Sequence, residues 1–288
     1  MKKTDIKRHH IPVSALLLLI VVALFVWWPL WFMITGSIMS EDELGLTVGP
    51  ALGVGEGYAI CHLLPSWPTA AHLLTLLLDT PQFFVMFWNS IQQSAAQVVG
   101  QFLVGAPAAW AISRLKFRGR GFIRALYVVL MLLPFQVTMV PSYLVLKDFG
   151  LLDTPWSVIL PGVFSTFPIF LMIRGFNSIP LEILESAAID GANHWQRFWK
   201  IGIPLGLPGI FSALTLAFLD AWNAIEQPMT FLKSQQNWPL SLYLTEVNTE
   251  ELGLAMAASL LMLLPSLLVF RFGQKYLEAG IGTGAVKG

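Results

Sequence analysis

The segment 185–192, ESAAIDGA, places carboxylates among small side chains. Ala187, Ala188 and Ala192 recur at helical spacing beside Glu185 and Asp190. Small side chains on one helix face let a second helix or a protein groove approach closely, and a glycine such as Gly191 ends or bends the helix. We therefore predict a docking surface for a cytoplasmic partner, made of Glu185, Ser186, Ala187, Ala188, Asp190, Gly191 and Ala192.

The alternative for this segment is an amphipathic helix that lies on the inner leaflet. Two features weigh against it. The acids Glu182, Glu185 and Asp190 would face a leaflet that is itself negative, and the small side chains offer little area to insert into lipid.

A stripe of amide side chains forms a second candidate site. Asn89, Gln93, Gln97 and Gln101 are each four residues apart, so they share one helix face. Amides inside a membrane helix line an aqueous path or hold helices together by hydrogen bonds, and both interpretations are open here.

A third candidate lies in the stretch FLDAWNAIEQP. Asp220, Trp222 and Asn223 offer a flat apolar ring beside hydrogen-bonding groups, which is what a sugar path requires. The alternatives are an interfacial tryptophan anchor and a structural aspartate paired with a neighbour.

Several kinds of chemistry lack their motif. The chain has no GxxxxGK[ST] loop for phosphates, no His/Cys cluster at metal-ligand spacing and no nucleophile-elbow or zincin pattern. Its single cysteine, Cys61, allows no internal disulfide. We therefore expect no enzymatic activity and no cofactor on this chain, so any work it does draws energy from another protein.

The composition predicts that these residues lie in or beside membrane-spanning helices. Of 288 residues, 56% are hydrophobic and only 12% charged, with a mean hydropathy of +0.68, whereas soluble domains carry about 25% charged residues. Charge-free runs long enough to cross a bilayer occur six times. We predict an all-α membrane protein, one permease domain over 1–288, with spans at about 12–36, 84–112, 122–146, 156–173, 204–226 and 253–272.

The basic residues predict the orientation of these spans. All but Lys147 and Lys233 of the 17 lysines and arginines fall at the N-terminus, between the second and third spans, between the fourth and fifth, or after the sixth. The positive-inside rule makes that side, with both termini, cytoplasmic. The segment of about 181–199 then becomes a cytoplasmic helix between spans four and five.

Residues 178–210, SIPLEILESAAIDGANHWQRFWKIGIPLGLPGI, resemble the EAA loop of ABC importer permeases. Glu185, Ala187, Asp190, Gly191 and Pro204 match its pattern, while Ser186 replaces its first alanine. The stretches NSIQQSAAQ, AAWAISRLKFRGR, AWNAIEQP, NWPLSLYL and GAVKG are similar to the carbohydrate-uptake branch, and within it to second membrane subunits of maltose-type transporters.

The resemblance implies a subunit of an ATP-driven, binding-protein-dependent sugar importer in the bacterial inner membrane. Its partners would be a second, non-identical permease, two ATPase subunits that hold ATP and Mg²⁺, a periplasmic solute-binding protein and membrane lipid, with no nucleic acid. The segment of about 181–199 would be the coupling helix, and the tail residues Gly284, Ala285 and Lys287 would reach the ATPases. The alternatives are a permease of this type for glycerol phosphate or polyamine, or an ATP-independent secondary transporter.

Overall fold

The computed structural model describes residues 12–52, 58, 62–246 and 251–282. Every regular element within these ranges is helical, which confirms the predicted all-α class. The chain forms two compact units. The first runs to Asp79 and takes in Val247–Leu260, whereas the second holds Thr80–Glu246 and the chain from Leu261 onward.

Among the described residues, five helices are long and apolar enough to cross a membrane. They are Val13–Gly36 (α1), Pro81–Arg114 (α4), Trp156–Asn177 (α7 with α8), His194–Trp222 (α10 through α11) and Leu252–Glu278, within α14 (Leu252–Gly282). A sixth crossing exists only if a bent helix pair counts as one span.

That pair occupies the predicted span over 122–146. The structure has α5 (Arg120–Met131) and α6 (Phe135–Asp148), bent by 105° between them. Pro134, which caps α6, has no N–H to continue a helix, and its ring disfavours the helical conformation at the preceding residue. The proline thus divides the apolar run.

Three more predicted helices are divided or shortened. The fourth span consists of α7 (Trp156–Val163) and α8 (Thr166–Asn177), and α11 (Ile203–Trp222) ends before the short α12 (Glu226–Phe231). The expected helix over 181–199 is divided into α9 (Leu181–Ile189), α10 (His194–Arg197) and the wider-turn helix η3 (Phe198–Gly202).

In the first unit, the described residues that follow α1 form short helices. Ser40 caps α2 (Glu41–Val48), and the Glu43 carboxylate accepts a hydrogen bond from the Ser66 N–H at 2.7 Å. The buried His72 in α3 (Ala71–Leu74) lies 2.9 Å from the Met39 carbonyl oxygen, and its ring contacts Gly253 of α14. This segment is therefore a packed structure that starts at the end of α1.

In the second unit, α4, α8 and α11 pack around a buried core. The backbones of α8 and α11 meet at Gly175 and Gly209, where a Cβ on Gly209 would lie 2.5 Å from the Gly175 Cα. Trp110 of α4 packs edge-on against Phe176 of α8, with ring centroids 5.3 Å apart, and both rings contact Phe198. Glycines permit this close backbone approach because they carry no side chain.

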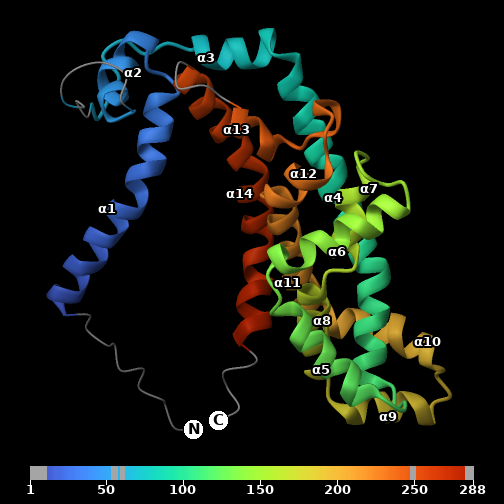
Figure 1. Ribbon diagram of the computed structural model, residues 1–288. Coiled ribbons are helices and arrows are strands. Elements are labelled where there is room, and N and C mark those ends of the chain that lie inside the picture. The colour runs from blue at the N-terminus through green and yellow to red at the C-terminus, as the bar shows by residue number, and fades with distance from the viewer. Residues whose placement is uncertain (1–11, 53–57, 59–61, 247–250, 283–288) are drawn as a thin grey trace. The chain divides into compact units, whose positions relative to one another are not determined.

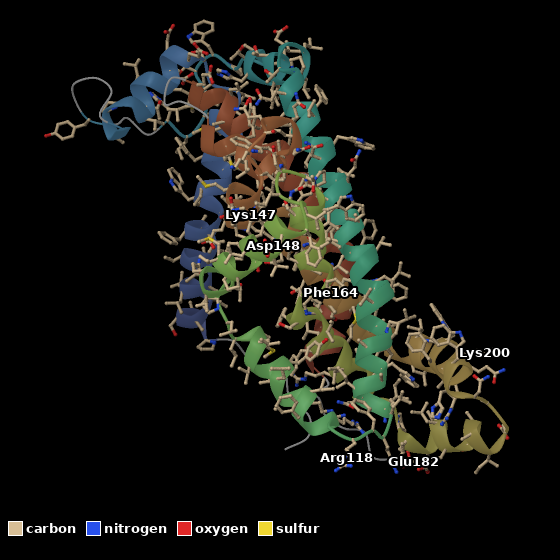
Figure 2. All side chains as sticks on the ribbon, turned by 45° about the vertical axis from the view of Figure 1, so that its right-hand side comes forward. Arg118, Lys147, Asp148, Phe164, Glu182 and Lys200 are labelled. Atoms are coloured by element: carbon tan, nitrogen blue, oxygen red, sulfur yellow. The ribbon has the colours of Figure 1, made fainter. Side chains whose placement is uncertain are left out.

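Within this unit, α9 and α10 lie beside the end of α4 at which the chain turns into α5, while α12 lies toward the opposite end (Figure 1). Figure 2 agrees, since Arg118, Glu182 and Lys200 gather at one end and Lys147 and Asp148 lie well away from it. The structure therefore brings the EAA-like segment to the same end as the basic loop between α4 and α5.

Candidate functional site

Helix α9 is built on local signals in the sequence. Pro180 stands at its N-cap, and Gly191 ends it with φ of +85°, a left-handed conformation that favours glycine. The Ala192 N–H donates to the Ala187 carbonyl at 2.9 Å and the Gly191 N–H to the Ala188 carbonyl at 3.1 Å, which is the Schellman pattern. The expected end of the helix at Gly191 is confirmed.

A capping box restarts the helix directly after this turn. The Asn193 side chain accepts from the Gln196 N–H at 2.8 Å, and the Gln196 side chain accepts from the Asn193 N–H at 2.9 Å. The chain therefore has a fixed turn between α9 and α10 that the sequence GANHWQ specifies.

Among the described residues, most of α9 has no packing partner. Leu184 is its one buried side chain, at 5% exposure, and it joins the core around Phe176. Ile189 is 86% exposed, and Glu185, Ser186, Ala188 and Asp190 are also exposed, whereas Ala187 and Ala192 are half-buried. The segment thus presents the predicted docking residues on a helix that one leucine anchors.

Two exposed tryptophans extend this surface, and the sequence analysis did not single them out. Trp195 of α10 is 63% exposed and contacts Trp199 edge-on, with ring centroids 5.8 Å apart. Phe198 lies between them in sequence and is buried in the core. The i, i+4 spacing of the tryptophans in NHWQRFWK was the available signal.

The amide stripe of α4 binds backbone carbonyls of its own chain. Asn89 donates to Gln236 O at 2.7 Å and to Trp238 O at 3.0 Å, and Gln93 donates to Asn237 O at 2.9 Å. These bonds fix the loop that contains the short helices η4 (Gln235–Asn237) and η5 (Leu240–Leu242).

The other two amides of the stripe, Gln97 and Gln101, contact the broken fourth span. The Gln97 amide contacts Val158 O of α7 at 3.5 Å, and Gln101 donates to Ser165 O at 3.0 Å, at the break between α7 and α8. Gln93, Gln97 and Gln101 are all buried. This geometry is what the interhelical hydrogen-bond interpretation of the stripe requires.

A cleft of about 690 Å³ lies where three helix breaks converge in the second unit. Met131 and Leu133 line it at the α5–α6 bend, Ser165 at the α7–α8 break, and Asp220 and Asn223 at the end of α11. The Asn223 amide donates to Leu219 O at 2.7 Å, and Asp220 is exposed. Of the six predicted path residues, the structure therefore brings Asp220 and Asn223 to this cleft.

Trp222 does not join that cleft. It is 1% exposed, stacks on Phe218 with ring centroids 5.7 Å apart, and donates its indole N–H to Met262 O of α14 at 3.0 Å. Successive helix residues point about 100° apart, so Trp222 faces the core. Its role in this fold is packing.

Two predictions remain, the C-terminal tail contact and the absence of a metal site. Gly284, Ala285 and Lys287 lie outside the described residues. Within the described ranges, no three His, Cys, Asp or Glu side chains are grouped to hold a metal ion.

In comparisons with known proteins, the chain is similar to membrane permease subunits of ABC transporters. The model for "Binding-protein-dependent transport system inner membrane component" matches residues 101–283. The inner membrane ABC transporter permease protein YcjP of Escherichia coli is 31% identical, with 78% of this chain and 83% of YcjP covered. The diacetylchitobiose uptake system permease protein DasC of Streptomyces coelicolor is 28% identical, with all of both chains covered.

Among solved structures, a chain of a bacterial ABC transporter involved in the import of the acidic polysaccharide alginate superposes with a TM-score of 0.76. It is 27% identical, with 92% of this chain and 95% of that chain covered. The likeness therefore extends over nearly the whole fold.

Proposed function

Because the chain belongs to the family of binding-protein-dependent transport system inner membrane components, we propose that it is one of two membrane subunits of an ATP-driven oligosaccharide importer. Relatives named for diacetylchitobiose and arabinooligosaccharide transport support oligosaccharides as the cargo. The family description supports a separate solute-binding protein that delivers the sugar.

One observation carries the mechanical part of the proposal: α9 is exposed on nearly every side and anchored by Leu184. An isolated helix of nine residues is marginal in water, and α9 buries little in its own chain. An ATPase subunit that accepts Ile189, Glu185 and the small side chains would cover this face. The exposed Trp195 and Trp199 would extend the contact, since tryptophans are common anchors at protein interfaces.

We assign this end of the protein to the cytoplasm. The arginines of the α4–α5 loop lie at the same end as α9, and basic loops stay inside. Counting α5 and α6 as one broken crossing gives six spans with both termini inside. The tail residues Gly284, Ala285 and Lys287 would then lie on the ATPase side.

The cleft at Asp220 and Asn223 is our candidate for part of the sugar path. Its volume of about 690 Å³ suits a mono- or disaccharide, and broken helices at membrane depth are tolerated where they line a cavity. The cycle would follow from this arrangement. ATP and Mg²⁺ on the ATPases close those subunits, α9 moves with them, and the path switches between inward- and outward-facing states while this chain binds no nucleotide.

Two other functions make different predictions. A permease for glycerol phosphate or polyamine would keep the docking helix but take another solute from its binding protein. A secondary transporter would take up solute without any ATPase subunit. Uptake by the two permeases alone in liposomes would favour this last function and contradict ours.

The docking assignment is tested by co-expressing the chain with its second permease and ATPase and purifying the complex. Glu185→Lys inverts a charge on α9, and we expect at least about tenfold less ATPase to co-purify, since tenfold corresponds to about 1.4 kcal/mol of binding energy. Gly191→Val, which places a β-branched side chain at a left-handed position, should have a similar effect.

Asp148→Lys is the matched control, because it makes the same charge inversion on an exposed residue far from α9 (Figure 2). It should retain the ATPase. Equal retention of the ATPase by Glu185→Lys and Asp148→Lys would contradict docking through α9.

A further inference from the structure

Three arginines at the cytoplasmic end of the second unit donate to backbone carbonyls. Arg114, the last residue of α4, donates to Phe176 O through Nε at 3.0 Å and through Nη2, and Nη2 also donates to Ile179 O. Arg120 and Arg124 of α5 donate to Ile112 O, at 2.7 Å and 2.9 Å, and both also reach Ser113 O. Guanidinium groups thus tie the ends of α4 and α8 to each other and to α5.

The two acceptors of Arg114 lie in the junction that leads into α9. Phe176 is in the last turn of α8, and Ile179 stands two residues before Leu181, where α9 begins. Both residues are buried, at 0% and 4% exposure. Arg114 therefore binds the segment that leads into the N-terminus of α9, in a well-packed site.

The other end of α9 is held differently. It ends at Gly191, and a Cβ built there would meet no atom within 4 Å. The N-terminal end of α9 therefore adjoins a packed junction, whereas its C-terminal end is a glycine turn with open space around it.

From Arg114, α4 runs back through Pro107 to the loop that contains η4 and η5. It is one helix of 34 residues, and its far half holds residues 236–238 through Asn89 and Gln93. The distance along the helix from Asn89 to Arg114 is roughly 38 Å at 1.5 Å per residue. A movement of the α9 base can thus reach the outer loop through one helix and one set of hydrogen bonds.

We propose that Arg114 is a positioning residue that makes α4 follow α9, so that ATPase movement on one side of the membrane reaches the loop at 236–238 on the other. The inference rests on the proposed function, because it takes α9 as the ATPase contact. The hydrogen bonds of a guanidinium fork are directional and charge-assisted, which suits them to transmit a displacement.

The test uses the assembled importer in nanodiscs, with Cys61→Ser and an environment-sensitive bimane label on Trp88→Cys. Trp88 is 59% exposed and precedes Asn89 on α4. In the parent importer, ATP with vanadate should change the label emission. In Arg114→Gln we expect the ATPase to stay bound and hydrolyse ATP, while the emission change falls by roughly tenfold, within the range by which coupling mutations act.

Arg118→Gln is the control in the same loop. It removes an equal charge from an exposed side chain that donates no hydrogen bond to any described residue and lies at the same end as α9 (Figure 2). It should respond like the parent. Arg114→Lys keeps the charge but offers one ammonium group instead of a guanidinium fork that reaches two carbonyls. Its emission change should therefore fall between those of the parent and of Arg114→Gln. If Arg114→Gln does not assemble, the response of Arg114→Lys tests the proposal.

The outcomes separate the two proposals. An ATPase that fails to co-purify with the parent chain contradicts the proposed function. A bound ATPase with a full emission change in Arg114→Gln or Arg114→Lys, or with no change in the parent, overturns the role of Arg114 alone. A parallel loss of docking, hydrolysis and response in both Arg114 variants would make these hydrogen bonds purely structural and would also overturn it.

Discussion

At the residue scale, the buried amides of α4 donate to backbone carbonyls of the segments packed against this helix. Gln97 reaches Val158 O of α7, and Gln101 reaches Ser165 O at the N-cap of α8. Burial makes an unpaired amide costly, and each of these contacts gives the amide a partner. The polar residues on this face of α4 therefore tie it to both halves of the broken fourth span.

The contact between Gln97 and Gly162 gives a prediction at this scale. A Cβ on Gly162 would lie 1.2 Å from Gln97 Nε2, so Gly162→Ala should displace the amide and lower the unfolding free energy by about 1–3 kcal/mol. Thermal unfolding of the purified subunit in detergent measures it. In a Gln97→Ala background the same change should cost much less, and equal costs in both backgrounds would show that the contact is unimportant.

Asp153 gives a pH prediction outside the spans. Its carboxylate accepts from the Ser234 hydroxyl and from the backbone N–H groups of Ser234, at 2.8 Å, and Lys233, at 2.9 Å. The Ser234 hydroxyl is the largest cause, and these bonds together lower the pKa of Asp153 to about 2. The folded-state pKa lies below the ordinary 3.8, so the stabilisation is complete above pH 4 and is lost as the pH falls toward 2.

Hydrogen exchange at the Lys233 and Ser234 amides, corrected for intrinsic rates, tests this loss. In the natural chain their protection should fall between pH 4 and pH 2. Asp153→Asn has no titrating group and tolerates the positive φ of 58° at this position, so its protection should be lower and independent of pH. A pH-dependent loss in Asp153→Asn as well would assign the effect to another group.

At the element scale, the second unit depends on close helix pairs and on breaks between helices. Prolines divide the apolar runs, as at Pro134, and the resulting short helices line the cleft at Asp220. The α8–α11 pair instead requires two glycines that face each other. Close packing and broken segments thus occur side by side in one membrane domain.

The α8–α11 contact predicts a large effect from one methyl group. Gly209→Ala would place a Cβ 2.5 Å from the Gly175 Cα, and backbone cannot rotate away, so the helices must separate. We expect a loss of about 1–3 kcal/mol or more in detergent, measured by thermal unfolding. Gly121→Ala in α5 is the control, since its Cβ would meet nothing within 4 Å and should be neutral or slightly stabilising.

At the scale of the whole molecule, the charge distribution predicts two chemically different faces. In a Cys61→Ser background, Arg118→Cys should react with an impermeant maleimide only in inverted vesicles, and Lys147→Cys only in intact cells. Both side chains are exposed, so reactivity reports the side of the membrane. Reaction of both from the same side would contradict the six-span topology.

Composition and local pattern were enough to predict the membrane class, the loops that carry the basic residues and the turn at Gly191, because these depend on composition and on residues within one or two helical turns. The sequence also predicted a docking segment, since small residues at four-residue steps define a helix face wherever the helix lies. It left the amide stripe open and grouped Trp222 with Asp220.

Where these side chains lie depends on tertiary contacts, because their partners are far away along the chain. Gln97 meets Val158 after 61 residues and Trp222 meets Met262 after 40, so no local pattern encodes the pairing. The bend at Pro134 was visible in sequence, but its angle of 105° depends on the helices packed around it. The short-range signals built the helices, and burial and hydrogen-bond satisfaction chose which faces meet.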